Sequence, residues 1–277
     1  MLDFTRFFVP EDLTSLAHTA IYAELSLAEK RRYNQCYALY LNEQTAILEQ
    51  LFTPFMEATA RLKWARPLQA GIAEMIREES IHAERFIEFN RRARPDLYEK
   101  TDWVFVHIPL LFSLLLRFLL KLPRWLPFPL WIILLLEERS LYYSARWAGS
   151  EVEPRFIKLH RLHAEDEDRH LELGNHLVQG LWASRPRLLR KGNARLLESV
   201  LREFFFHPKR AALRVVQVAF PNHPRLAEMQ AQLLNLSKNR DFLRSLYNRT
   251  SNPLTLARLE RDPDLLPVLQ MLEGKRP

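Results

Sequence analysis

The sequence predicts an all-α fold, and three observations support this. Only six of its 277 residues are glycine, which is few for an α/β or all-β protein. Leu, Arg, Glu and Ala dominate, and apolar residues recur at helical spacing along several long segments. Most of the seventeen prolines lie at the edges of these segments, where proline begins or ends a helix.

Composition also limits the classes of function. Cys36 is the single cysteine, so neither an intrachain disulfide nor a cysteine-based metal cluster can form. The N-terminus lacks the basic and apolar regions of a secretory signal, and we expect a reducing compartment, the cytoplasm. The formal net charge is +7, but Lys and Arg are scattered, so no nucleic-acid partner is expected.

The order of helices suggests three parts: a lead-in over residues 1–25, a bundle over 26–182, and a C-terminal helical extension over 183–277 that packs on the bundle. Ser26-Leu-Ala-Glu29 is a capping box that opens the first long helix, which is expected to end or kink near Pro54. Further helices are predicted over residues 67–93, 129–148, 154–182, 194–206, 208–220 and from 224 onward.

The segment 163–170 carries the strongest chemical pattern. His163, Glu167 and His170 are four and then three residues apart, so they lie on one face of a helix together with apolar neighbours. A buried carboxylate beside two imidazoles is costly unless it is paired or binds a metal. Taken alone, the segment is equally typical of a solvated acidic run with incidental histidines.

A second pattern lies on the helix over residues 67–93. Glu79-Ser-Ile-His82 places a carboxylate and an imidazole on the apolar face that includes Met75. Glu78 and Glu84 fall off this stripe and are expected at the surface. One Glu-x-x-His motif by itself is a weak signal, because any helical protein contains it by chance.

Two single acids complete the candidate set. Glu43 lies among apolar residues on the first long helix. On the helix over residues 129–148, Arg139 and Arg146 mark a wet face, and Glu137 lies nearly opposite them. Helical phase therefore favours Glu137 over its neighbour Glu138, although the choice between them stays open.

Together these residues form a twofold pattern along the chain. A single Glu is followed by Glu-x-x-His, and this order then repeats: Glu43, Glu79, His82, Glu137, Glu167, His170. A four-helix bundle of two antiparallel pairs would bring these groups to one centre. Four carboxylates in a dry core need neutralisation, and two divalent iron or manganese ions suit such mixed ligands.

The segment over residues 103–136 is the most apolar part of the chain. His107, Pro109 and Arg117 interrupt it, which argues against a transmembrane hairpin. We expect helices that cover the metal site or line its substrate entrance. Peripheral contact with a membrane surface is the minor alternative.

The order Glu, Glu-x-x-His, Glu, His-x-x-x-Glu-x-x-His resembles the p-aminobenzoate N-oxygenase-like diiron oxygenases of the ferritin-like superfamily. The resemblance covers roughly residues 26–182 and includes Tyr33-Asn-Gln and Asn42-Glu43. It implies a ferritin-like bundle with two iron ions, manganese being possible. It also implies seven ligands: Glu43, Glu79, His82, Glu137, His163, Glu167 and His170. His160 is a weaker substitute for His163.

The resemblance further implies an oxygenase. In such an enzyme, a peroxo-diiron(III) species formed from O2 would oxidise a small apolar molecule or aromatic amine, most often at nitrogen, with electrons from an external donor or reductase. Hydroxylation or desaturation of a lipid-like substrate is one alternative, and a ferritin-type iron-handling protein is another. A homodimer is compatible with the sequence.

Overall fold

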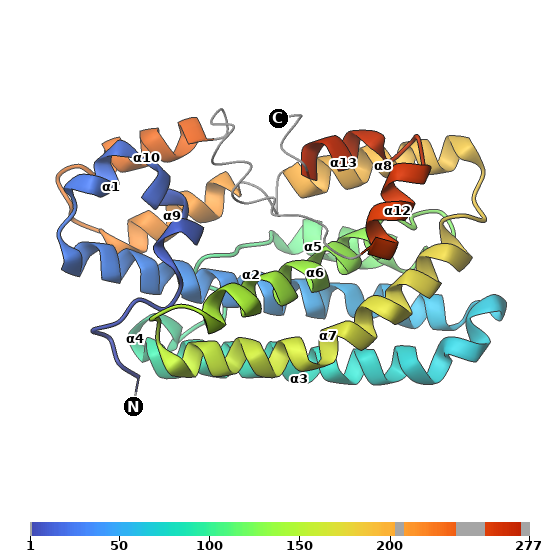
Figure 1. Ribbon diagram of the computed structural model, residues 1–277, viewed down its shortest axis with the longest axis horizontal. Coiled ribbons are helices and arrows are strands. Elements are labelled where there is room, and N and C mark those ends of the chain that lie inside the picture. The colour runs from blue at the N-terminus through green and yellow to red at the C-terminus, as the bar shows by residue number, and fades with distance from the viewer. Residues whose placement is uncertain (1, 203–207, 237–252, 273–277) are drawn as a thin grey trace.

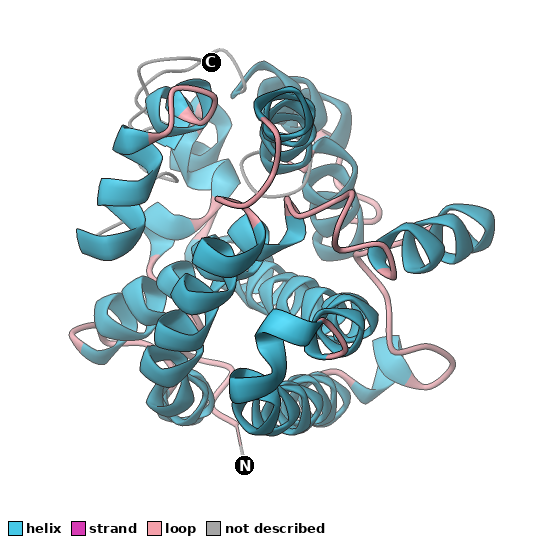
Figure 2. Cartoon of the chain, turned by 90° about the vertical axis from the view of Figure 1, so that its right-hand side faces the viewer, coloured by secondary structure: helices cyan, strands magenta, loops and turns pink. Residues whose placement is uncertain are grey.

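The computed structural model describes residues 2–202, 208–236 and 253–272, and within these ranges every regular element is a helix (Figure 2). The all-α prediction is therefore confirmed. Four long helices run along the molecule, as Figure 1 shows. They are α2 (Leu27–Ala60), α3 (Gln69–Ala93), α6 (Pro129–Ala148) and α7 (Pro154–Leu181).

The four long helices form two antiparallel pairs. Helix α2 packs along α3 and helix α6 along α7, and α3 and α2 also contact α7 and α6, respectively. Short connections join the members of each pair, namely η3 (Lys63–Leu68) between α2 and α3 and residues 149–153 between α6 and α7. The longer crossover from α3 to α6 carries α4 (Pro95–Tyr98) and α5 (Leu110–Leu120). This is the ferritin-like bundle.

Helix α2 begins as the sequence predicts but ends later. The Ser26 hydroxyl accepts a hydrogen bond from the Glu29 backbone N–H, and the Glu29 carboxylate accepts one from the Ser26 N–H. The helix then continues through Pro54 to Ala60, so the predicted end is wrong. Proline removes one helical hydrogen bond, whereas the last turns bury Phe55 and Met56 in the core, which holds them helical.

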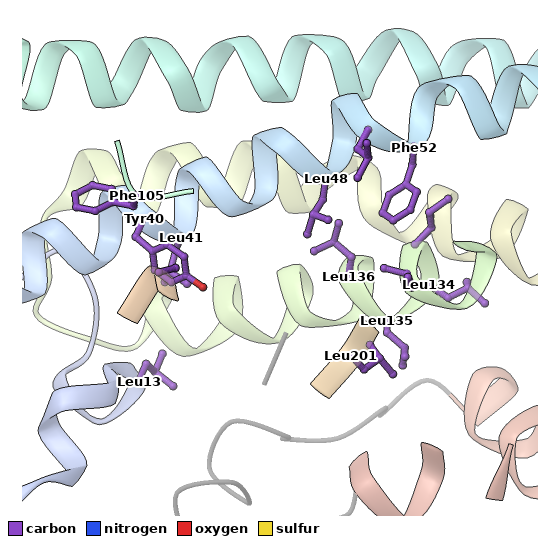
Figure 3. Packing of buried hydrophobic residues seen from close by; sticks show 14 of the residues in the cluster. Leu13, Tyr40, Leu41, Leu48, Phe52, Phe105, Leu134, Leu135, Leu136 and Leu201 are labelled. Atoms are coloured by element: carbon purple, nitrogen blue, oxygen red, sulfur yellow. The ribbon is translucent and has the colours of Figure 1, made fainter. Parts of the chain in front are cut away.

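The core of the bundle is a continuous set of apolar side chains between the helix pairs. Leu48 and Phe52 of α2 point towards Leu136 of α6 (Figure 3). Trp131 and Trp147 on α6 are almost completely buried. Each fully buried large side chain contributes about 1.5–3 kcal/mol relative to exposure, so this packing fixes the spacing of the helices that carry the polar centre.

Shorter helices cover both ends of the bundle. At one end lie η1 (Glu11–Leu13), η2 (Ser15–His18), α1 (Ala20–Glu24), α9 (Lys209–Ala219) and α10 (Leu226–Asn235). At the other end lie α8 (Arg187–Val200), α12 (Pro253–Arg261) and α13 (Leu266–Leu272), visible at the upper right of Figure 1. Helix α8 begins seven residues before the predicted helix over 194–206, directly after Pro186, and residues 203–207 lie outside the described ranges.

Helix α5 differs from the expectation of burial. It packs on α2, and its Leu120 is buried, but Leu111, Leu114 and Leu115 are exposed. The helix stands away from the bundle at the right of Figure 2. The helix is apolar on almost every side, and α2 is its main neighbour, so one face is buried and another is exposed.

No helix in the described part of the chain is long and apolar enough to span a bilayer.

The close approach of α6 and α7 depends on Gly174. A Cβ atom at this position would lie 2.7 Å from Cδ2 of Leu134, which is fully buried and has no room to move. We expect Gly174→Ala to lower the free energy of unfolding by about 1–3 kcal/mol in urea denaturation. Gly192→Ala in α8 is the matched control, since nothing lies within 4 Å of its Cβ.

The control should be neutral or should stabilise the protein by about 0.5–1 kcal/mol, because alanine is the better helix former. Equal effects of the two substitutions would contradict the packing account.

Candidate metal centre

Seven buried side chains meet between the four long helices. Their nitrogen and oxygen atoms fall into two groups, and in each group the potential ligand atoms lie within 4.8 Å of one another. The first group consists of Glu49, Glu79, His82 and His163, and the second consists of Glu79, Glu137, Glu167 and His170. Glu79 belongs to both groups, so the two form one continuous centre.

Short distances connect the histidines to the carboxylates. His163 Nε2 lies 3.0 Å from Glu49 Oε1 and 2.7 Å from Glu167 Oε1, and it thereby joins α2 to α7. His170 Nδ1 lies 2.8 Å from Glu79 Oε1 and 3.2 Å from Glu167 Oε2. The carboxylates of Glu79 and Glu167 therefore lie at the middle of the centre, each close to a histidine.

Several of these atoms are buried and make no hydrogen bond of normal geometry, although other groups of the centre lie close to them, and such burial is costly in a protein interior. They are both carboxylate oxygens of Glu49 and of Glu79, Nδ1 of His82, Nε2 of His163, and Oε1 of Glu167. All of them belong to the two groups described above. Hard carboxylate oxygens with imidazole nitrogens suit divalent iron or manganese, so the residues present fit a pair of such ions.

The ionisable groups of the centre strongly influence one another's pKa values. Burial raises the pKa of Glu49 to about 7 and holds the pKa of Glu137 well above its usual range, where the charges of Glu167 and Glu79 add to the effect. For His170 burial acts in the opposite direction. The hydrogen bonds and charges of Glu167 and Glu79 outweigh it and raise the pKa to about 11. Without metal, therefore, protons neutralise part of the carboxylate charge, and metal binding must displace them.

Outer carboxylates orient two of the histidines. His82 Nε2 lies 3.1 Å from Asp166 Oδ2, and His170 Nε2 lies 3.0 Å from Glu78 Oε2. Each histidine and its acid come from different helices, α3 and α7. In each pair Nε2 of the histidine faces the acid, and Nδ1 faces the centre. Such carboxylate–histidine pairs fix the ring and its tautomer. The expectation that Glu78 lies at the surface is wrong, because this bond draws its side chain inward.

Arg169 joins the two outer carboxylates. Its Nη2 lies 3.0 Å from Glu78 Oε1 and 2.5 Å from Asp166 Oδ1, and about half of its side chain is exposed. The guanidinium neutralises charge that the outer acids would otherwise add beside the four inner ones. Burial raises the pKa of Glu78 and of Asp166, but the histidines that they face and Arg169 outweigh this effect, so the pKa of each acid lies below its usual range.

The structure places Glu43 outside both groups, unlike the other six residues that the sequence proposed as ligands. Its carboxylate accepts hydrogen bonds from the Tyr98 hydroxyl at 2.6 Å and from the backbone N–H groups of Val104, Phe105 and Val106 at 2.8–2.9 Å. These donors fill the positions that a metal would need. Glu43 instead fastens the crossover between α4 and α5 to helix α2.

Glu49 is the glutamate that α2 contributes to the first group, where the sequence analysis proposed Glu43. The two residues are six positions apart, so their side chains project about 120° from one another around the helix. The sequence does contain a signal for Glu49. Its separation from Glu79 is 30 residues (79 − 49), the same as the separation of Glu137 from Glu167 (167 − 137), whereas Glu43 gives 36.

The sequence also left open the choice between Glu137 and Glu138 and offered His160 as a substitute for His163. Glu137 lies in the second group, and Glu138, although buried, lies in neither. His163 lies in the first group. His160 points instead to Asn42, with Nε2 and Oδ1 3.0 Å apart.

A four-helix bundle in which two Glu-x-x-His helices and two further glutamates share one buried centre defines the ferritin-like dimetal-carboxylate proteins. A model of one family, described as P-aminobenzoate N-oxygenase AurF, matches residues 2–252 of the chain, and the chain belongs to that family. The family is one of diiron oxygenases, so this protein is a diiron-dependent oxidoreductase. A search of curated proteins finds no match.

The choice between Glu49 and Glu43 can be tested by two isosteric substitutions. We expect Glu49→Gln to reduce iron well below two ions per chain, since an amide removes a negative charge from the first group. Glu43→Gln should keep its iron, although it lowers the melting temperature because an amide NH2 then faces backbone donors. Iron is measured by elemental analysis of the folded, reconstituted protein. The reverse pattern of iron loss would contradict the assignment.

Proposed function

We propose that the protein binds two iron ions through Glu49, Glu79, His82, Glu137, His163, Glu167 and His170. We further propose that it uses O2 to oxidise a small neutral amine at nitrogen. Membership of the N-oxygenase family supports the reaction, and the two groups of buried ligands support the iron pair. The observation that carries the substrate class is a cavity that reaches three of these carboxylates.

This cavity lies between α2, α3 and α6. It is a narrow, partly open cavity, and it is lined by Glu49, Glu79 and Glu137 at the centre. The remaining lining is almost entirely apolar: Phe52, Met56, Met75, Ile76, Ile133 and Leu136, with Thr53 as the one hydroxyl. Ile133 and Leu136 come from the apolar segment over residues 103–136, which supports the expectation that part of this segment lines a substrate entrance.

The lining favours an uncharged substrate. None of the ten residues that line the cavity is cationic, so a carboxylate on the substrate would be desolvated there without a partner. A neutral aromatic amine has an apolar ring for the lining, and its nitrogen can face the carboxylates.

The residues of the chain have three tasks in this proposal. The apolar lining excludes water and aligns the substrate with the centre. Asp166 and Glu78 hold His82 and His170 with Nδ1 towards the centre. An iron pair bound there supplies the reduction of O2 and the transfer of one oxygen atom.

The overall reaction requires outside electrons. Conversion of R–NH2 to R–NHOH with O2 takes two electrons and two protons and releases one water molecule. We therefore propose an external electron donor, a reductase or small redox protein.

A second candidate, hydroxylation of an apolar substrate at carbon, is favoured by the same lining. It needs the same electrons and the same centre but no amine. The two candidates differ in which atom of the substrate receives oxygen, and one experiment distinguishes them.

In that experiment, the protein reconstituted with Fe(II) is incubated with 18O2, a chemical reductant and a set of aromatic compounds. The set pairs aniline-type amines with the corresponding compounds that lack nitrogen, and with amines that carry a carboxylate. We expect 18O on nitrogen of the neutral amines, detected by mass spectrometry, and at least about tenfold less product from the carboxylates. Oxygen on carbon would favour the second candidate, and iron oxidation without any labelled product would contradict both.

His163→Ala provides a further test of the centre. The variant should still bind iron, because six proposed ligands remain, but it should lose most of the labelled product because the first group then lacks one of its two nitrogen donors. His160→Ala is the control, since that histidine lies in neither group. Full activity of His163→Ala would remove His163 from the reaction.

A further inference from the structure

Helix α5 presents an exposed apolar stripe to solvent. The stripe consists of Leu111, Leu114, Leu115 and Phe118 on α5 and Leu122 just after it, and Leu111 is 83% exposed. These positions follow a spacing of three or four residues, so they lie on one face. Monomeric proteins rarely expose this many large apolar side chains side by side, and such a surface normally binds a partner.

The stripe is an outward face of an anchored helix. Leu120 projects from the opposite side of α5 and is 2% exposed, and α5 packs on α2 of the bundle. Helix α5 is therefore attached through one side and open on the other.

Cations border this stripe. Arg117, Lys121 and Arg124 are exposed on α5 and the turn that follows, and Trp125 beside them is 66% exposed. The sequence contains no Asp or Glu between Asp102 and Glu137. The exposed surface thus combines apolar side chains, an aromatic side chain and positive charge.

We propose that α5 and the turn after it, residues 110–125, dock the protein on an anionic phospholipid surface. Leucine and phenylalanine enter the acyl boundary, Trp125 lies at the level of the headgroups, and the three cations contact lipid phosphates. With eleven residues α5 is far shorter than the roughly twenty needed to cross a bilayer, so it lies in the interface. A second copy of the chain is a poorer occupant, because pairing the two stripes would bring like charges together. This inference is independent of the proposed reaction.

Co-sedimentation with lipid vesicles tests the proposal on the full-length protein. We expect binding to vesicles of phosphatidylcholine mixed with phosphatidylglycerol, and much weaker binding to phosphatidylcholine alone. The double variant L111E/L115E should lose at least about tenfold in affinity. Each of Lys121→Gln and Arg124→Gln should lose about fivefold, the effect of one charge near an anionic surface. Circular dichroism verifies that the variants stay folded.

Leu188→Glu on α8 is the matched control, because that leucine is 85% exposed on another helix, and it should bind vesicles like the wild type. Binding should also shift tryptophan emission to the blue, and Trp125→Phe should remove most of the shift. The proposal is overturned if the protein ignores anionic vesicles or binds both vesicle types equally. It is also overturned if the wild type is a dimer in solution that L111E/L115E dissociates.

Discussion

Four carboxylates share one dry centre in this protein, and their charge must be neutralised. Glu49, Glu79, Glu137 and Glu167 come from the four long helices α2, α3, α6 and α7, one from each, and all are buried. Two divalent cations carry four positive charges, which equals the charge of the four ionised glutamates. Protons held by His163, His170 and Glu137, whose pKa values are raised, can offset part of the same charge. The bundle around the centre must therefore be rigid enough to hold like charges together, and its apolar core supplies that rigidity.

The two halves of the bundle repeat one arrangement. In each half a single glutamate precedes a Glu-x-x-His motif by 30 residues. Glu78, directly before the first motif, orients His170, and Asp166, directly before the second motif, orients His82. Arg169 connects these two outer acids at the surface. The centre is asymmetric where His163 joins the first group, and this nitrogen donor distinguishes the two proposed metal positions. The cavity reaches both groups, through Glu49 and Glu137.

The sequence predicted the parts of this arrangement that depend on local spacing. Glu79 and His82, like Glu167 and His170, are one helical turn apart, so their shared face follows from the helix alone. The choice between Glu43 and Glu49 depends instead on distant groups. Glu43 is saturated by backbone donors of residues 104–106, which come from a crossover whose path the sequence does not specify. The exposure of α5 was missed for a related reason: its apolar composition predicts burial, and only the packing of the described residues shows that one of its sides is exposed.

Anomalous X-ray diffraction at the iron edge, on crystals of the iron-loaded protein, tests the central claim most directly. The account predicts two iron peaks within the bundle, one bounded by Glu49, His82 and His163 and the other by Glu137, Glu167 and His170, with Glu79 between them. Glu43 should remain hydrogen-bonded to Tyr98 and to the crossover backbone. A single peak, or an iron ion coordinated by Glu43 in place of Glu49, would contradict it.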